Sequence, residues 1–412
     1  QQSRERPALR EPQIVFVETH GRLLKKGGAD LKKSQADWRV TCFADEQAAL
    51  DEIERKGLTL VLANLGPDHQ GCERFLRTVR DRAPMAIRMA LVPDLRDGKC
   101  VPALEYAHQC LAEQMGAEQI EEAVGRGLAM WSRVAANENL AGFLSDLHTL
   151  PTPPALYFDI RDELASPNGS MHRVAEHIAR DPALTAKILK VVNSGLYGLP
   201  RSVSDLHHAI VLLGAETLMA LVLAARLFAQ LPLPGLKLDS LWVHCTMVAA
   251  LAKEIAAEEG GDQKAMSASA VAGLLHDIGG LVFLANAPQR YFPLVRQAVG
   301  DESVLLEKEH ALFGLGHPEL GAYLLELWGL PDGIVEAVSV HHDLRWDALD
   351  DVALPCKAVF GAEWLIQKAA HLGEAEPTDS VVKPHPEVPE DMLGGWLRAF
   401  ERVAKRGLVT KG

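Results

Sequence analysis

The pair His276-Asp277 lies inside an apolar run, residues 270–285, and constrains this chain more than any other feature. No other side chain among those sixteen positions is polar. A run this apolar is expected to be buried, and burying an imidazole and a carboxylate without partners costs several kcal/mol. We therefore expect a metal ion, or a network of other polar side chains, to meet these two residues in the core.

The composition describes an ordinary globular protein. The 412 residues suggest two or three domains, and 48% hydrophobic with 24% charged residues is typical of soluble chains. The formal net charge is −13. Proteins that bind nucleic acid by neutralising phosphates usually present a basic face, so direct binding to nucleic acid is disfavoured.

The cysteines and the apolar stretches point to the cytoplasm. Six cysteines are scattered without a CxxC pair, which is typical of reduced thiols rather than a disulfide framework. The first residues lack the apolar core of a signal peptide. The longest apolar stretches carry polar residues at their centres, so we expect no membrane span and a cytoplasmic location.

The first part of the chain alternates between two patterns. Near-continuous apolar runs at 13–18, 38–43, 58–65 and 86–92 are separated by polar or helical segments. This alternation predicts a doubly wound parallel sheet. Apolar residues at three- and four-residue steps after residue 117 predict a long connecting helix.

After the connecting helix the strand signals nearly vanish. Helical patterns punctuated by Gly and Pro, among them one continuous pattern at 267–284, predict an all-α domain. A Pro- and acid-rich segment near the end is followed by an amphipathic pattern from Glu390 to Lys405. The expected organisation is a flexible tail (1–12), a sheet domain (13–116), a connecting helix (117–142), a helical domain (143–370), and a flexible segment with a last amphipathic helix (371–412).

Several motifs of the second half resemble the HDOD family, an HD-related output domain of bacterial signalling proteins. They are the run from Asp181 to Ser194, the run from Leu206 to Gly214, the Gly273–Gly279 segment GLLHDIG, and Val340–Asp343. The resemblance covers about 143–370 and implies a helical, non-catalytic domain of a regulatory protein.

The first part resembles a response-regulator receiver domain that lacks its chemistry. The resemblance implies a nucleophile, an acidic pair, a hydroxyl and a lysine; the corresponding positions are Asn64, Glu18-Thr19, Leu91 or Val92, and Glu113. An amide cannot attack a phosphoryl donor, and one acid holds Mg²⁺ poorly. The fold class is thus expected to be α/β plus all-α: a flavodoxin-like doubly wound pseudo-receiver, unphosphorylatable, followed by a helical HD-type domain.

The same resemblance implies a metal site in the helical half. The first ligands map onto His244, His276 and Asp277, the additional histidines onto His317, His341 and His342, and the last acid onto Glu363, which replaces the usual Asp. Imidazoles and carboxylates suit a divalent ion such as Mn, Fe, Zn or Mg. Without metal, Asp277 would accept hydrogen bonds from the imidazoles in a satisfied polar network.

Two departures weigh against catalysis. The related phosphodiesterases carry a lysine three residues after the Asp, where this chain has Gly280, and the Gly-Tyr-Pro signature after His341-His342 is missing. The main expectation is therefore a non-catalytic regulator that acts through protein partners. The alternatives are a metal-dependent phosphohydrolase and a nucleotide sensor, and a homodimer through the connecting helix is left open.

Overall fold

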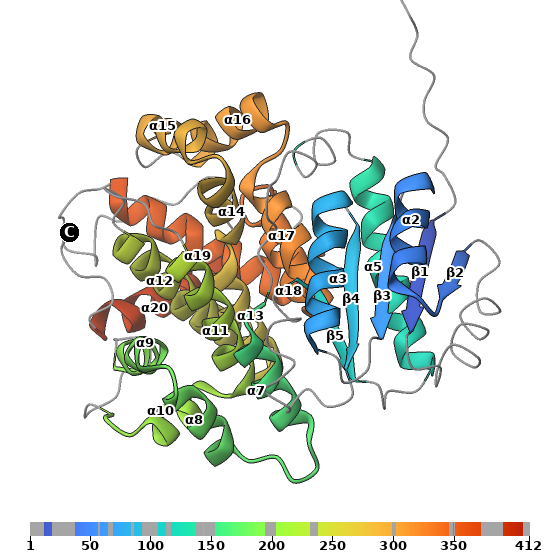
Figure 1. The fold of residues 1–412 in the computed structure, drawn as a ribbon. Coiled ribbons are helices and arrows are strands. Elements are labelled where there is room, and N and C mark those ends of the chain that lie inside the picture. Colours follow the sequence, from blue (N-terminus) through green and yellow to red (C-terminus); the bar gives the residue numbers. More distant parts are fainter. Residues whose placement is uncertain are drawn as a thin grey trace, which may run out of the picture. The chain divides into compact units, whose positions relative to one another are not determined.

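The computed structural model describes residues 12–18, 38–56, 58–64, 69–83, 86–92, 106–112, 117–136, 143, 153–193, 203–230, 238–298, 302–345, 349, 351–371 and 390–406. The chain divides into two compact units (Figure 1). Unit 1 comprises residues 1–158 with 327–329, and unit 2 comprises 159–326 with 330–412. The receiver-site position Glu113 lies outside the described residues.

Unit 1 is built on a five-stranded parallel sheet, which confirms the parallel sheet expected from the apolar runs. The strands are β1 (Gln13–Glu18), β2 (Arg39–Phe43), β3 (Leu60–Asn64), β4 (Ile87–Val92) and β5 (Gln109–Ala112), in the order β2-β1-β3-β4-β5. All residues of β3 and β4 are buried, as expected for central parallel strands covered on both faces. The short β5 was not among the predicted strands.

Helices cover the sheet of unit 1 on both faces. Helices α2 (Glu46–Lys56) and α3 (His69–Arg82) lie on one side, and α5 (Ala117–Ala136) lies on the other (Figure 1). The apolar stripe of α5 is buried: Ile120 is 7% exposed, Val124 0% and Leu128 4%. This stripe packs against the sheet within the unit, so it is not available for the dimer contact that the sequence suggested.

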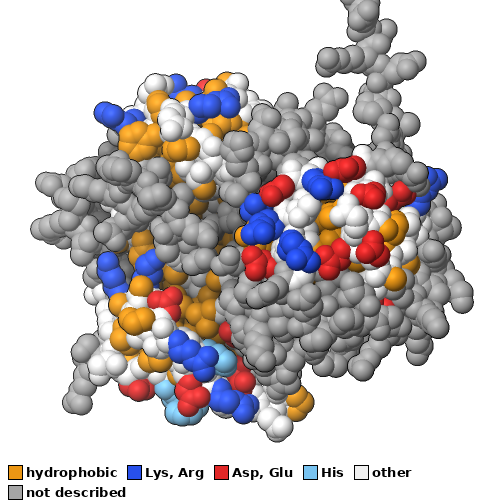
Figure 2. All heavy atoms as spheres, viewed as in Figure 1, with side chains coloured by type: hydrophobic (Ala, Val, Ile, Leu, Met, Phe, Trp, Pro, Cys, Tyr) orange, Lys and Arg blue, Asp and Glu red, His pale blue; other side chains and the backbone are white. Residues whose placement is uncertain are grey.

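The outer face of α2 and α3 carries charges of both signs. Figure 2 shows acidic and basic side chains interspersed over this region of unit 1. Arg74 lies 3.7 Å from Glu46, and Arg82 lies 2.7 Å from Glu54. Among the described residues of this face, the charges are mixed and form no basic stripe of the kind that binds a phosphate backbone.

Unit 2 is helical. Helix α7 (Ala155–Ala165) leads into it, and the rest follow in order: α8 (Met171–Ala179), α9 (Pro182–Val192), α10 (Leu206–Leu213), α11 (Ala215–Gln230), α12 (Leu238–Glu258), α13 (Gln263–Leu275), α14 (Ile278–Asn286), α15 (Pro288–Ala298), α16 (Glu302–Phe313), α17 (His317–Leu327), α18 (Asp332–Val340), α19 (Leu354–His371) and α20 (Glu390–Lys405).

Side-chain caps define where several of these helices begin. Ser170 accepts a hydrogen bond from the backbone N–H of Arg173, and Asp262 accepts one from Ala265. Asp181 accepts from two N–H groups at the start of α9, whose first residue is Pro182. Such caps satisfy the free N–H groups of the first turn, and proline is favoured there because it lacks the N–H.

One long helix expected from the sequence is in fact two. The segment from Ser267 to Leu284 breaks at His276-Asp277, where α13 ends and α14 begins. Helices α15, α16 and α19 were not predicted. The stretch Gln263–Asn286 is apolar and long enough to cross a membrane, yet 78% of its apolar window is buried inside the domain, as in a core helix.

Candidate metal centre

The His-Asp pair lies at the break between α13 and α14, where both side chains can take part in a binding site. His276 is the C-terminal cap of α13, and Asp277 is the N-terminal cap residue of α14. A capping aspartate usually accepts a backbone N–H of its own helix. The Asp277 carboxylate makes no such bond and points into the space between the surrounding helices.

Two glycines next to the pair let neighbouring helices approach closely. A Cβ at Gly273 would lie 3.0 Å from the backbone N of Ala249 in α12, and one at Gly279 would overlap the carbonyl oxygen of His317. A side chain at either position would push these helices apart. The glycines therefore bring His276-Asp277 within reach of α12 and of the start of α17.

The first group of side chains, here the first subsite, comprises His244, His276, Glu363 and one Asp277 oxygen. Glu363 Oε1 lies 2.8 Å from Nε2 of both His244 and His276, and these two Nε2 atoms are 3.2 Å apart. Asp277 Oδ2 lies 3.2 Å from His276 Nε2 and 3.6 Å from His244 Nε2. Glu363 thus reaches the site despite its longer side chain.

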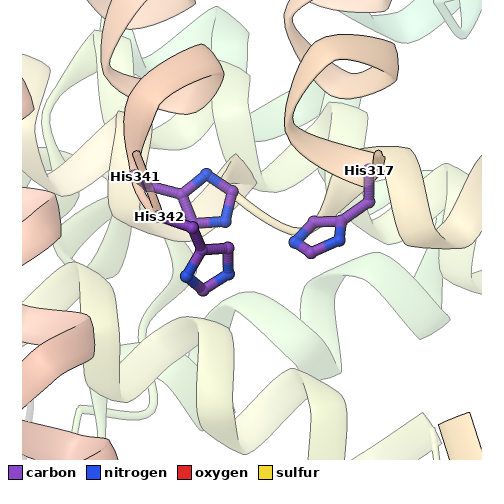
Figure 3. A group of neighbouring side chains, drawn as sticks. All are labelled: His317, His341 and His342. Carbon is purple, nitrogen blue, oxygen red and sulfur yellow. The ribbon is translucent and has the colours of Figure 1, made fainter. Parts of the chain in front are cut away.

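The second group, here the second subsite, comprises His317, His341, His342 and the other Asp277 oxygen. Figure 3 shows the three imidazole rings turned toward a common space, His341 and His342 from the end of α18 and His317 from the start of α17. Asp277 Oδ1 lies 3.4 Å from His317 Nε2 and 4.0 Å from His341 Nε2. Asp277 therefore faces both subsites, one oxygen toward each.

Hydrogen bonds on the far side of the rings fix their orientation. The Nδ1 atoms of His276 and His341 lie 2.8 and 2.7 Å from the carbonyl oxygens of Gly273 and Val338. His317 Nδ1 lies 2.9 Å from Glu309 Oε2. Because these oxygens can only accept, Nδ1 donates, and the neutral ring presents an unprotonated Nε2 to the site.

The inward atoms lack the partners that a satisfied polar network would supply. Among the described residues, Nε2 of His317, His341 and His342 and Oε1 of Glu363 are buried without a hydrogen bond of acceptable geometry. Buried polar atoms are normally paired. Ligands of a tetrahedral ion with bonds of about 2.1 Å lie about 3.4 Å apart, close to the spacings of the first subsite. The residues present therefore fit divalent metal better than a satisfied network.

Without a bound ion, the acids and imidazoles of the site set one another's charge states, and a metal ion would displace the protons held by the cationic imidazoles. Burial lowers the pKa of His276, but the Asp277 and Glu363 carboxylates together outweigh burial and raise this pKa well above its ordinary value. Burial raises the pKa of Glu363, but His244 and His276 bring it well below the ordinary value. Burial and the neighbouring His317 lower the pKa of His342 to about 4, so this imidazole is neutral near pH 7 and can bind metal.

A buried carboxylate that the sequence reasoning missed supports the second subsite. Glu309 in α16 is 0% exposed. Its Oε2 accepts from the backbone N–H and Nδ1 of His317, at 2.7 and 2.9 Å, and its Oε1 accepts from the Tyr291 hydroxyl at 2.6 Å. The signal was present, because Leu305, Glu309 and Phe313 recur at four-residue spacing on the buried side of one helix.

Two more residues at the site were not singled out from the sequence. The Cys245 thiol lies near His276 and Asp277, and the ligand atoms of the three residues are within 4.8 Å of one another. Because His276 and Asp277 also belong to the first subsite, Cys245 does not define a separate site. Glu302, whose side chain is 36% exposed, has its Oε2 4.0 Å from His342 Nε2. It lies at the open rim, where the His244 and Asp277 side chains are also 30% and 21% exposed.

The receiver-like position in unit 1 contains an amide and an acid in contact. Glu18 and Asn64 end two adjacent strands in register, and Asn64 Nδ2 donates to Glu18 Oε1 at 3.3 Å. Both residues are buried, at 0% and 1% exposed. Leu91 and Val92 end the neighbouring strand β4 as buried apolar residues, where a hydroxyl was sought.

Comparisons with known proteins fit this picture. Residues 150–344 match the HDOD domain family model. A 206-residue segment is 25% identical to an uncharacterized protein of Treponema pallidum (strain Nichols), covering 50% of this chain and 40% of that relative, so the chain spans less than half of the relative's length.

Two solved structures are also similar. An HDOD domain protein of unknown function from Geobacter sulfurreducens is 27% identical, with 64% of this chain and 92% of that chain covered and a TM-score of 0.48. A protein of Shewanella amazonensis, provisionally named a phosphohydrolase, is 21% identical, with 65% and 93% covered and a TM-score of 0.47. Both TM-scores are below 0.5, so the assignment rests on the family match: residues 150–344 of this chain are an HDOD domain.

Proposed function

We propose that this chain is a bacterial signal-transduction regulator whose HDOD domain holds two divalent metal ions and acts through protein contacts. One observation carries the metal assignment. Within the described part of the chain, the Nε2 atoms of His317, His341 and His342 are buried without hydrogen-bond partners, and those of His317 and His341 lie 3.4 and 4.0 Å from Asp277 Oδ1. A divalent ion in the second subsite would satisfy these three atoms together.

The residues of the centre would share the work of holding the ions. His244, His276 and Glu363 would hold the first ion, the second-subsite histidines the second, and Asp277 would face both. When bound, such ions act as Lewis acids and lower the pKa of a ligated water. The chain's own contribution is a set of rings oriented through Nδ1, which reduces the cost of organising the ligands on binding.

A regulatory rather than catalytic role is supported by the residue at position 280. A lysine expected in the related phosphodiesterases is replaced by Gly280, and a Cβ there would lie 3.2 Å from the Tyr291 hydroxyl. Tyr291 is itself held by Glu309. The Tyr291–Glu309 pair therefore occupies the space beside position 280. With glycine at position 280, the chain has no cationic side chain there to pair with a substrate phosphate.

The N-terminal unit fits a receiver that has lost phosphorylation. The strand order β2-β1-β3-β4-β5 is the order of flavodoxin-like sheets. At the position of the nucleophile, the Asn64 amide already donates to Glu18. We therefore propose a pseudo-receiver that transmits signals through contacts with other proteins. Incubation with acetyl phosphate should leave the protein mass unchanged, and a labile phosphoryl adduct would contradict this assignment.

The metal assignment is tested by elemental analysis of protein purified without chelator. We expect close to two equivalents of a transition metal in the wild-type protein and a large loss in the His276→Ala, Asp277→Ala double variant. His172→Ala is the matched control, because His172 is 75% exposed on α8 and pairs only loosely with Glu176 at 3.5 Å. A metal-free wild-type protein whose variants behave identically would refute the metal centre.

Phosphoester hydrolysis is a second candidate, favoured by the open rim. The His244, Asp277 and Glu302 side chains are 30%, 21% and 36% exposed, so the centre is in contact with solvent, which a hydrolytic site requires. A screen of nucleotide and cyclic-nucleotide phosphoesters against the metal-loaded protein separates the alternatives. Turnover that disappears in the double variant would establish the hydrolase; tight binding without turnover would establish a nucleotide sensor.

A further inference from the structure

Helix α20 packs along α12, which carries His244, and its Trp396 side chain reaches α19, which carries Glu363. Trp396, in the middle of α20, is 0% exposed and heads the set of largest fully buried side chains in the described part of the chain. Both α19 and α20 lie beyond residues 150–344, the segment that matches the HDOD family. The family match therefore leaves the role of α20 unassigned.

A single carboxylate joins α12, α19 and α20. Glu259 directly follows α12, and its Oε1 accepts a hydrogen bond from Trp396 Nε1 at 2.9 Å. Its Oε2 accepts one from Lys357 Nζ of α19 at 2.8 Å. Charge-assisted bonds from two helices to one partly buried carboxylate fix the distance between those helices.

The Trp396 ring rests on a glycine of α19. A Cβ at Gly361 would lie 2.7 Å from Trp396 Cζ3 and 2.8 Å from Cη2, closer than van der Waals contact allows. Gly361 precedes Glu363 by two residues, so the two positions lie on nearly opposite sides of the helix. Trp396 therefore packs against the side of α19 that faces away from the metal centre.

Ion pairs set how α20 lies along α12. Arg402 Nε is 2.8 Å from Glu254 and its Nη1 is 2.7 Å from Glu258; Arg398 lies 2.8 Å from Glu258, and Arg406 lies 2.7 Å from Glu254. Single exposed pairs of this kind contribute little, but a network fixes geometry. The network therefore supports the placement of Trp396 over Gly361 and Glu259.

We propose that α20 is a positioning element for the first subsite: Trp396, seated on Gly361 and bonded to Glu259, sets the spacing of α12 and α19 and thereby the 2.8 Å approach of Glu363 to His244. The metal part of this inference rests on the proposed function. Residues of the second subsite come from α17 and α18 instead, with Asp277 from α14. Loss of α20 packing should therefore weaken the first subsite selectively.

The test uses Gly361→Ala, which changes no ligand and no residue of α20. Alanine favours the helix more than glycine does, so α19 itself is not weakened, but its Cβ displaces Trp396. In a cobalt(II) titration followed by visible absorption, we expect the first subsite to weaken about tenfold or more while the second changes little. Gly361→Ala with Trp396→Phe removes the overlapping outer ring but also the Nε1–H bond to Glu259, so it should recover only part of the affinity. Lys405→Ala, on the exposed side of α20, should match wild type.

A second readout does not depend on metal. Spin labels at the exposed positions Ser240 on α12 and Lys368 on α19, in a background with Cys42 and Cys100 replaced by serine, report the spacing of these helices. We expect Gly361→Ala to shift or broaden the distance distribution, and the added Trp396→Phe to restore it in part, because the overlap is relieved while the bond to Glu259 is lost. An unchanged distribution, or equal weakening of both subsites, would overturn the positioning role. If wild type binds no cobalt and the distance still responds, the metal proposal fails while the positioning of the helices stands.

Discussion

Replacing Glu309 by glutamine should weaken the second subsite without touching any ligand. The Glu309 carboxylate accepts three hydrogen bonds, two from His317 and one from the Tyr291 hydroxyl, and is fully buried. Glutamine has the same shape but one acceptor oxygen and one NH₂ donor. Whichever way the amide turns, a donor faces either His317 or Tyr291.

The size of the effect follows from these contacts. Leaving one buried donor without an acceptor costs about 1–3 kcal/mol of folding free energy. Glu309 also contributes to raising the pKa of His317 to about 9, against the effect of burial, and its charge makes the ring a stronger ligand. Loss of a carboxylate behind a ligating histidine typically lowers metal affinity 10- to 100-fold, or about 1.4–2.8 kcal/mol.

Calorimetric titration of the metal-free protein with Mn²⁺ measures both subsites, and thermal melting of the metal-free protein measures the folding cost. Glu307→Gln is the matched control, because it makes the same change on the same helix at an exposed position. We expect Glu309→Gln to weaken one binding event and Glu307→Gln to weaken neither. Two unchanged binding events in Glu309→Gln would refute the supporting role of this carboxylate.

Three further predictions follow from the charges. Because the His317 pKa is raised to about 9, a metal ion that binds this ring below pH 9 must displace a proton. The metal affinity of the second subsite should therefore rise toward pH 9, by up to about tenfold per pH unit. Metal titrations that give the same affinity at several pH values would contradict this. Asn64→Asp should lower the unfolding free energy of unit 1 by about 1–3 kcal/mol at neutral pH, because it replaces the hydrogen bond to Glu18 by two carboxylates in contact. Denaturant unfolding in acid, where a carboxylate is protonated, should show that part of this free energy is recovered. Burial raises the Glu254 pKa, but hydrogen bonds from Arg402 and Arg406 bring it below its ordinary value. The Glu254 carboxylate therefore stabilises the fold above its unfolded pKa, and this contribution is lost as the pH falls through the folded pKa. Arg402→Gln should lower the melting temperature near neutral pH and hardly at all in strong acid.

Much of the architecture could be predicted because local patterns determine it. The strands β1, β3 and β4 are continuous apolar runs, and such runs between helical segments give a parallel sheet. The short β5 (QCLA) carries too little pattern to be distinguished from a loop. The break at His276-Asp277 was missed because an apolar run continues through it, and only the packing against α12 and α17 shows why the chain turns there.

The sequence named the imidazoles and acids that the structure brings together, but not the residues that support them. Histidines and acids in family order point to a site because those residue types bind metal. Helix α16 (ESVLLEKEHALF, 302–313) contains three glutamates. Only helix phase distinguishes them in the sequence, and only Glu309 falls on the buried stripe. The Trp396–Glu259 bond joins residues 137 positions apart, a pairing that a single sequence cannot reveal.

The central claim is most directly tested by anomalous X-ray diffraction from crystals of the protein purified without chelator, with data collected on either side of a metal absorption edge. Two bound ions would give two peaks, one bounded by His244, His276 and Glu363 and one by His317, His341 and His342, with an Asp277 oxygen beside each. A map without peaks, with Asp277 instead hydrogen-bonded directly to the imidazoles and no buried Nε2 left unpaired, would contradict it.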